Sequence, residues 1–334
     1  MRILIIKLSS IGDLIHCVPA YRQLKKHLPH AKIDWLVYKN LSSCLENFVE
    51  QDNRIELEDK NFFTLIKKAQ SLKSQYDYVI DLQGLFKTAL LAKIINAKSS
   101  YGFNFPRESW AKYFYTKSFC DFVSLNSKKH IIEQNLELIE SFLEQVLHIK
   151  ANTEIDFSFA SPIKPKKQET EKKQLCIIPA TTWESKHWHI NNWVELLKRI
   201  DCSQYEIYAT GSPANSKYLN SIRELSATPL KIIDNKKLPE LFDFYGQMDT
   251  IIGVDTGPLH IAAASLFAKK DQKKIIGIYG PTSASRSGPY GFSALSADEI
   301  LAKQASNKKT LSADENSIDS ISVDMVLESA SLVL

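Results

Sequence analysis

A carboxylate and a single glycine follow the first apolar run of the chain. The segment Ser9–Asp13 (SSIGD) comes directly after Arg2–Leu8, and Gly12 permits a tight turn before a helix. Asp13 could simply cap that helix, as aspartate often does. A carboxylate at the mouth of a ligand-binding cleft is also well placed to act as a general base. Because the loop lacks the GxGxxG fingerprint of dinucleotide-binding proteins, it argues against a nicotinamide-dependent oxidoreductase.

Two hydroxyls and a lysine follow the apolar run Leu175–Pro179. Thr181 and Thr182 could donate hydrogen bonds to a diphosphate, and Lys186 could meet the charge of a leaving group. The alternative is a surface loop anchored by its two tryptophans.

A third segment leads from the apolar run Thr250–Val254 into a helix through Asp255, Thr256 and Gly257. Gly257 allows a close backbone approach, and the proline after it suits a first helical turn. The N–H groups of such a helix start are suited to a phosphate. Asp255 is itself negative, so we expect it to accept hydrogen bonds from sugar hydroxyls. His260, one turn later, could instead be a core histidine.

The fourth segment, Tyr279–Thr282 (YGPT), ends the apolar run Lys274–Tyr279. It contains the turn-forming residues expected beside such a site, and its role could be purely structural.

The elements that must position these segments alternate between apolar runs and stretches of helical periodicity. This βα alternation occurs on both sides of Ser161–Lys173, which is rich in proline and lysine. It predicts an α/β fold of two doubly wound, Rossmann-like domains facing across a cleft. The expected boundaries are 1–160 for the first domain, 161–173 for the linker, 174–320 for the second domain, and 321–334 for a final helix that could pack back on the first domain.

Composition agrees with this organisation. A length of 334 residues predicts about two domains. With 44% hydrophobic and 24% charged residues, the chain is an ordinary globular protein and not a disordered or fibrous one. A formal net charge of +4 does not by itself indicate a nucleic-acid-binding protein. Between Lys60 and His130, however, the sequence has twelve basic and only four acidic residues. This region is therefore either a solvated face or a surface that receives an anion.

The five cysteines have no CxxC pair and no histidine at zinc-ligand spacing. They are typical of small buried residues in a reducing compartment. The sequence has no apolar stretch of 18 residues, and charges interrupt the apolar N-terminus. We therefore expect a cytoplasmic protein that could touch a membrane surface without crossing it.

Five segments together resemble the bacterial lipopolysaccharide heptosyltransferases of glycosyltransferase family 9. The resemblance runs in the same order along nearly the whole chain, and the ATT…KHW segment favours the first heptosyltransferase of that family over the second. The segments are KLSSIGDLIHCVPA (Lys7–Ala20), VIDLQGLFKTALLA (Val79–Ala92), ATTWESKHW (Ala180–Trp188), GVDTGPLHIAAA (Gly253–Ala264) and YGPT.

The resemblance implies a GT-B fold and transfer of L-glycero-D-manno-heptose from ADP-heptose to a Kdo sugar of Kdo2-lipid A, with inversion at the anomeric carbon. It implies that Asp13 is the base. The donor would be bound by Thr181, Thr182, Lys186, Asp255, Thr256, Gly257 and His260. The acidic acceptor would be bound by basic residues of the first domain, for which Lys60 and Arg107 are the candidates by position.

No DxD triad is present, and a lysine with a helix N-terminus can replace a metal at a leaving diphosphate, so we expect neither a metal nor a cofactor. The expected partners are ADP-heptose, Kdo2-lipid A and the cytoplasmic face of the inner membrane, with no nucleic acid. Two alternatives stay open. One is the second heptosyltransferase or a relative with another acceptor, and the other is a non-catalytic nucleotide-sugar-binding protein.

Overall fold

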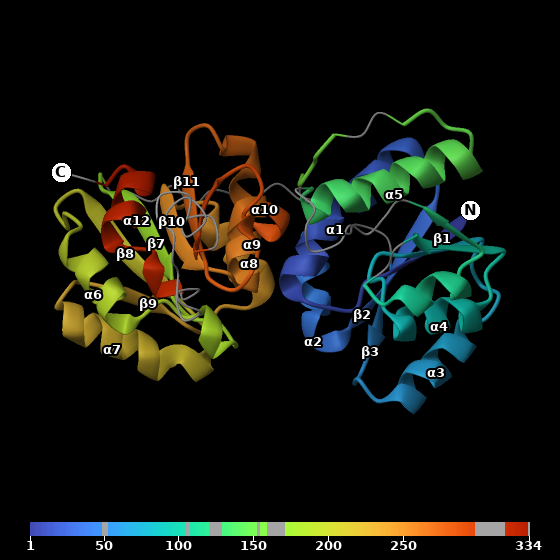
Figure 1. Cartoon of the computed structure of the whole chain (residues 1–334), viewed down its shortest axis with the longest axis horizontal. Helices are drawn as coiled ribbons and strands as arrows, with labels where there is room; N and C mark the ends of the chain where they lie inside the picture. The colour runs from blue at the N-terminus through green and yellow to red at the C-terminus, as the bar shows by residue number, and fades with distance from the viewer. Residues whose placement is uncertain are drawn as a thin grey trace, which may run out of the picture. The chain divides into compact units, whose positions relative to one another are not determined.

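The computed structural model describes residues 1–48, 53–104, 107–119, 129–151, 154–158, 171–297 and 318–332. The chain forms two compact units, Met1–Pro162 and Ile163–Leu334, and each is described here by itself (Figure 1). Most of the predicted linker, 161–173, lies outside the described residues, and its last residue begins a strand.

The first unit is built on a six-stranded parallel sheet in the order β3-β2-β1-β4-β5-β6. Its central strand has the sequence RILII and is buried almost throughout, as an apolar run without polar alternation predicts. Ile5 pairs with Trp35 on one side and Ile80 on the other. The strands are β1 (Arg2–Ile6), β2 (Lys32–Tyr38), β3 (Arg54–Leu57), β4 (Tyr78–Asp81), β5 (Ser99–Phe103) and β6 (Lys117–Phe119).

Helices cover both faces of this sheet. The chain leaves β1 towards β2 but leaves β4 in the opposite direction, towards β5, so right-handed crossovers place α1 and α4 on opposite faces. Helix α5 packs on α1, whereas α3 and the short helix η2 pack on α4 (Figure 1). The helical segments are α1 (Ile11–His27), α2 (Lys39–Ser42), η1 (Ser43–Leu45), α3 (Phe62–Ser71), α4 (Phe86–Ile95), η2 (Ser109–Phe114) and α5 (Ile131–Val146).

The second unit repeats the same topology. Its six parallel strands lie in the order β12-β11-β10-β7-β8-β9, which is the order of the first sheet with the strands renumbered. The strands are β7 (Lys173–Ile178), β8 (Tyr205–Thr210), β9 (Lys231–Ile233), β10 (Thr250–Val254), β11 (Lys274–Tyr279) and β12 (Ser293–Ser296). The helical segments that the argument uses are η3 (Glu184–Lys186), α6 (Ile190–Lys198), α7 (Ser216–Ser226), α8 (Leu238–Tyr245), α9 (Gly257–Leu266), α10 (Ala284–Ser287), η6 (Ile318–Ser320) and α12 (Val323–Ala330).

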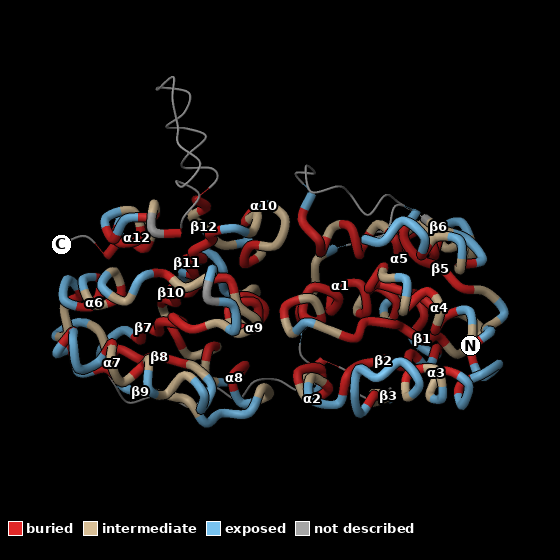
Figure 2. The backbone as a smooth tube through the Cα atoms, turned by 60° about the horizontal axis from the view of Figure 1, so that its bottom comes forward, coloured by how far each residue is buried: buried red, intermediate tan, exposed pale blue. Residues whose placement is uncertain are grey.

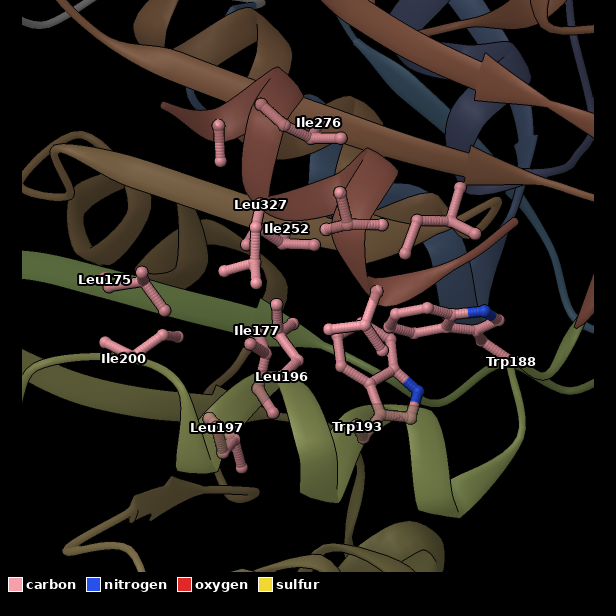
Figure 3. Packing of buried hydrophobic residues seen from close by; sticks show 14 of the residues in the cluster. Leu175, Ile177, Trp188, Trp193, Leu196, Leu197, Ile200, Ile252, Ile276 and Leu327 are labelled. Carbon is pink, nitrogen blue, oxygen red and sulfur yellow. The ribbon is translucent and has the colours of Figure 1, made fainter. Parts of the chain in front are cut away.

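Both sheets are buried between their helices, while exposed residues concentrate in the outer helices and loops (Figure 2). In the second unit the core contains two tryptophans, Trp188 and Trp193, whose rings meet edge to face at 5.0 Å (Figure 3). The Trp188 indole N–H donates to the carbonyl of Ile321 at 2.9 Å, so the polar atom of this buried ring has a partner.

The last helix, expected as a segment that could pack back on the first domain, has its apolar face in the core of the second unit. The apolar side chains of α12 lie on one face, at the helical spacing of Val323, Val326, Leu327 and Ala330, and they belong to the core of the second unit. This face is therefore already covered within its own unit.

Among the helices that the structure describes, none has both the length and the apolar character needed to cross a membrane.

Candidate functional site

The predicted site residues gather where each sheet reverses its strand order. In such sheets ligands bind beyond the carboxyl ends of the strands, at this switch point. The switch lies between β1 and β4 in the first unit and between β7 and β10 in the second. Asp13 follows β1, whereas Lys186 follows β7 and Asp255 follows β10. The three side chains thus occupy the expected edges of their sheets.

Asp13 lies in the first turn of α1 and caps that helix, as the structural interpretation of this residue predicted. Its Oδ2 accepts hydrogen bonds from the Ser10 N–H at 2.9 Å and the Ser10 hydroxyl at 3.0 Å. Its side chain is nevertheless 31% exposed, so a substrate can reach it. Capping and catalysis are therefore compatible here.

A buried lysine stands behind Asp13. Lys7, directly after β1, has a side chain that is only 3% exposed, and its Nζ lies 3.9 Å from Asp13 Oδ1. The same ammonium donates to the carbonyl of Leu82 at 2.8 Å. Burial raises the pKa of Asp13, but the Lys7 charge, the hydrogen bonds from Ser10 and the Arg107 charge together outweigh it and leave that pKa lowered. Asp13 is thus held ionised, as a base must be.

The loop before Asp13 is held by the neighbouring strand. Gln83 follows β4, and its side-chain oxygen accepts from the N–H of Leu8 at 3.0 Å and of Ser9 at 3.4 Å. Gln83 is itself positioned by Asp81, which accepts from the N–H groups of Gln83 and Gly84. Gly84 has a φ of +69°, a conformation that glycine adopts without strain.

Asp81 is fully buried at the end of β4, where the Tyr115 hydroxyl donates to it at 2.8 Å. Burial raises its pKa in spite of these hydrogen bonds. The VIDLQG segment is thus a support for the Asp13 loop.

In the second unit, three loops meet at one carboxylate. Asp255 Oδ2 lies 2.5 Å from Lys186 Nζ and accepts from the Thr282 hydroxyl at 2.6 Å. Its other oxygen lies 3.6 Å from His260 Nε2. Because β7, β10 and β11 are neighbours in the sheet, the loops that follow them reach the same place. Thr282 comes from the fourth segment, which the sequence alone left without a role.

The neighbours of Asp255 in this cluster determine its protonation state. Burial raises the pKa of Asp255, but the hydrogen bond and charge of His260 and the hydrogen bonds from Lys186 and Thr282 lower it well below its ordinary value. Asp255 is about one-tenth exposed and is ionised at neutral pH. A negative charge that holds a lysine beside a helix start can set the position of that lysine for a ligand.

The hydroxyls predicted to grip a phosphate lie in a loop that is closed on itself. His187 Nε2 lies 3.2 Å from the backbone nitrogen and 2.8 Å from the backbone oxygen of Thr181, and the His187 ring stacks on Tyr218 at 5.5 Å. Thr182 in this loop is exposed. The sequence analysis did not identify His187 as the residue that closes the loop, although it is part of the ATT…KHW segment.

Helix α9 begins beside the cluster, as the third segment predicted. Thr256 is its N-cap in extended conformation, and its side chain makes no capping hydrogen bond. Gly257 is the first helical residue, and both residues are partly exposed. Pro258 has no N–H and the Leu259 N–H donates to the Thr256 carbonyl at 3.0 Å, so the Gly257 N–H is the first-turn donor that can receive an anion.

The two candidates for the acceptor lie at the same edge of the first sheet as Asp13. Lys60 follows β3 and is exposed, with its Nζ 5.9 Å from the centre of the Tyr38 ring. Arg107 follows β5, is also exposed, and is close enough to Asp13 for its charge to lower the pKa of that carboxyl. Of the two, Arg107 has the more direct connection to the candidate base.

The site residues thus form one group in each unit. Within the portion of the chain that the structure covers, no three His, Cys, Asp or Glu side chains are grouped so that they could hold a metal ion.

Comparison with known proteins gives this arrangement a family. The model of glycosyltransferase family 9 (heptosyltransferase) matches residues 65–316. Lipopolysaccharide heptosyltransferase 1 of Salmonella typhimurium is 26% identical over 305 residues, which cover 87% of this chain and 92% of that protein.

Two solved structures have the same fold. The structure of E. coli heptosyltransferase WaaC with ADP superposes with a TM-score of 0.76 at 22% identity, covering 98% of both chains. E. coli ADP-heptose lps heptosyltransferase II gives a TM-score of 0.74 at 19% identity, covering 99% of this chain and 98% of that one. The fold class is therefore the expected GT-B arrangement of two parallel-sheet α/β domains. Since the family model spans well over half of its length, the chain belongs to glycosyltransferase family 9, the heptosyltransferases, and is a glycosyltransferase.

Proposed function

We propose that the protein is lipopolysaccharide heptosyltransferase I, which transfers L-glycero-D-manno-heptose from ADP-heptose to a Kdo sugar of Kdo2-lipid A. The observation that carries the proposal is that each unit has its own charged group at the switch point of its sheet: an accessible, ionised Asp13 in the first and the Lys186–Asp255 ion pair in the second. The name of the Salmonella relative and its coverage of both chains support the choice of the first heptosyltransferase.

The donor binds to the second unit. Its diphosphate lies against the start of α9 at Thr256 and Gly257, with hydrogen bonds from Thr181 and Thr182. Lys186 supplies the positive charge and turns from Asp255 towards the phosphates when the donor arrives. Asp255 keeps the hydrogen bond from Thr282 and accepts further hydrogen bonds from sugar hydroxyls, with His260 beside it.

The reaction is a single displacement with inversion. Asp13 accepts the proton of the attacking Kdo hydroxyl, whose oxygen forms a bond to the anomeric carbon of the heptose. The bond from that carbon to the diphosphate oxygen breaks, and ADP leaves with the electron pair. Lys186 and the α9 N-terminus stabilise the charge that develops on ADP. Inversion requires that the attacking oxygen, deprotonated by Asp13, and the leaving diphosphate lie on opposite faces of the sugar.

These groups supply the charge stabilisation that a divalent ion supplies in other transferases, and we propose that the reaction needs no metal. Activity that persists in EDTA is the expected result, and its abolition by EDTA with recovery on adding Mg²⁺ would contradict this part of the proposal.

The acceptor binds to the first unit. Its acidic groups meet Lys60 and Arg107 at the edge that carries Asp13, and its lipid stays in the inner membrane while the enzyme works at the cytoplasmic surface. The fold likeness to heptosyltransferase II keeps an acceptor that already carries one heptose as the second candidate.

A mass-spectrometric assay tests the proposal. Purified protein is mixed with ADP-heptose and Kdo2-lipid A, and free ADP and the acceptor mass are followed together. The expected result is one added heptose per acceptor with an equal amount of ADP. Transfer only to an acceptor that already carries heptose would favour the second heptosyltransferase. Donor binding without transfer to either acceptor would favour a non-catalytic nucleotide-sugar-binding protein.

A further inference from the structure

Exposed aromatic side chains gather in three segments of the first unit. Among the described residues, six aromatic side chains are strongly exposed, and all but Trp183 belong to this unit. Phe63 is 80% exposed, Trp110 71% and Tyr113 67%, and two further phenylalanines are exposed by about half. Such exposure is unfavourable in water unless the side chains contact a partner. We call this set the aromatic surface; it consists of Phe62, Phe63, Phe86, Trp110 and Tyr113.

The three segments lie at one edge of the first sheet. Phe62 and Phe63 begin α3 after β3, Phe86 begins α4 after β4, and Trp110 lies in η2 after β5. The packing of α3 on α4, and of α4 on η2, places these segments side by side (Figure 1). The ring of Phe86 meets that of Phe114 edge to face at 5.1 Å, which joins α4 to η2.

This is also the edge that carries Asp13. The carboxyl ends of parallel strands lie at one edge of a sheet, and Asp13 follows β1 there. An object that contacts the aromatic surface therefore lies on the same side of the first unit as the candidate base.

Basic side chains stand between the aromatic ones. Lys60 and Lys87 both approach the Tyr38 ring, at 5.9 and 5.8 Å, and Lys112 lies 5.3 Å from the ring of Tyr113. Arg107 is exposed in the segment before η2. The edge thus combines exposed rings with positive charge.

The acidic side chains at this edge are paired. Glu58 forms an ion pair with Lys39 at 2.9 Å, and Asp59 accepts from the Asn61 N–H at 2.8 Å. Glu108 accepts from the Phe86 N–H at 2.6 Å. Of these three carboxylates, Glu58 is neutralised by a lysine, and the other two are held by backbone N–H groups.

We infer that the aromatic surface seats the first unit on an anionic lipid bilayer, an inference that rests on the proposed transfer to a lipid-anchored acceptor. Aromatic rings concentrate at the boundary between lipid headgroups and acyl chains, and lysine and arginine are attracted to anionic headgroups. A soluble acidic protein could form ion pairs with the lysines, but it would need a complementary pocket or surface for each of the five rings. A bilayer can bury the rings without any fixed complementary shape. Seated in this way, the enzyme presents Asp13 to sugars that project from the membrane.

Vesicle binding tests the inference without relying on transfer. Wild-type protein and the double variant Phe63→Ser/Trp110→Ser are sedimented with vesicles of phosphatidylglycerol and phosphatidylethanolamine, and with neutral phosphatidylcholine vesicles. The matched control is Leu225→Ser, because Leu225 is an exposed apolar residue of α7 in the second unit. All three proteins are checked for equal thermal unfolding, as substitutions at exposed sites predict.

We expect wild type and the control to bind the anionic vesicles, and the double variant to bind them at least about tenfold more weakly. Binding of wild type should fall as salt rises, and it should be much weaker on neutral vesicles. Equal binding by the double variant would overturn the inference, and so would absence of wild-type binding to anionic vesicles. Equal wild-type binding to neutral and anionic vesicles would also overturn it.

The depth of insertion gives an independent test. Trp35, Trp188 and Trp193 are fully buried, so a Trp183→Phe protein leaves Trp110 as the exposed tryptophan. Lipids brominated on their acyl chains should quench its fluorescence when anionic vesicles are added. A spectrum that does not change, although the protein sediments with the vesicles, would show that another surface is in contact.

An activity comparison separates the two proposals. The double variant should transfer heptose to a water-soluble, deacylated Kdo acceptor at the wild-type rate, but at least about tenfold more slowly to acceptor embedded in vesicles. Equal loss on both acceptors would place these residues in acceptor binding and overturn the membrane role. If wild type transfers heptose to neither acceptor, the proposed function fails, while the vesicle and quenching results still decide whether this surface binds a bilayer.

Discussion

Lys186 and Asp255, which come from loops 69 residues apart in the chain, form an ion pair with 2.5 Å between Nζ and Oδ2. Taken separately, the lysine was expected at a diphosphate and the aspartate at sugar hydroxyls. Their contact means that each side chain sets the position of the other before a donor arrives. The Thr282 hydroxyl, in the loop after β11, also donates a short hydrogen bond to Asp255 and so helps to fix the position of its carboxylate.

Removing the lysine should weaken donor binding. For Lys186→Met we expect affinity for ADP-heptose to fall by about ten- to a hundredfold, because a charge-assisted hydrogen bond contributes about 1.5–3 kcal/mol. Isothermal titration calorimetry measures this, and Lys198→Met, an exposed lysine of α6, is the control. Wild-type affinity in the Lys186 variant would remove the lysine from the donor site.

Thr282 tests whether the orientation of Asp255 matters. Thr282→Val keeps the shape of the side chain but cannot donate to Asp255, so we expect donor affinity to fall by about fivefold, corresponding to about 1 kcal/mol for one hydrogen bond. Thr282→Ser restores the hydroxyl and should recover most of the affinity. If the valine and serine variants bind alike, the hydrogen bond has no role in donor binding.

The pH dependence of the reaction tests the contact between Lys7 and Asp13. The lowered pKa of Asp13 keeps it ionised throughout the neutral range, so the acid limb of kcat/KM should lie below the ordinary carboxyl range. Lys7→Met removes the nearest positive charge, which raises the pKa of Asp13 and should move the acid limb to higher pH.

The exposed lysine Lys32, at the start of β2, gives the matched control Lys32→Met, which should leave the profile unchanged. If the acid limb of kcat/KM in Lys7→Met stays at the wild-type pH and only the maximal kcat/KM falls, Lys7 does not set the pKa of Asp13. Thermal unfolding of both variants distinguishes a shift in pKa from a loss of fold.

The two basic residues at the first edge should affect acceptor binding and not donor binding. In a Lys60→Ala/Arg107→Ala variant we expect the KM for Kdo2-lipid A to rise by about tenfold or more, with donor affinity unchanged, because two exposed cations that meet anionic groups are lost. Lys117→Ala, a lysine of the edge strand β6, is a control in the same unit. An unchanged acceptor KM would exclude both residues from the acceptor site.

The sequence was most informative about strands buried on both faces. The predicted ranges of β10 and β11 agree with the structure, because the runs TIIGV and KIIGIY have no polar alternation and end at turn-forming residues. The half-buried strand β3, with the sequence RIEL, was not predicted, since four residues with two charges give too weak a pattern. The outer strand β12, with the sequence SALS, was also missed, because four small or polar residues with one leucine give no strand pattern.

The site could be predicted in part. Position after a buried strand was enough to single out Asp13, Lys186 and Asp255. The side chains that support them were not predicted, because Gln83 and Thr282 act through contacts between strands that are distant in sequence. In the sequence, Lys7 was considered only as a charge that interrupts an apolar run. A charge in such a run is the signal that could have indicated a buried cation beside a carboxylate.

The most direct test of the account is the effect of Asp13→Asn on turnover and on donor binding in the same preparation. The substitution keeps a side chain that can accept the capping hydrogen bonds from Ser10 but removes the base. We predict that transfer of heptose falls by about a hundredfold or more while ADP-heptose binds as in wild type. Near-normal transfer with normal binding would show that Asp13 is not the base and would contradict the mechanism proposed for this enzyme.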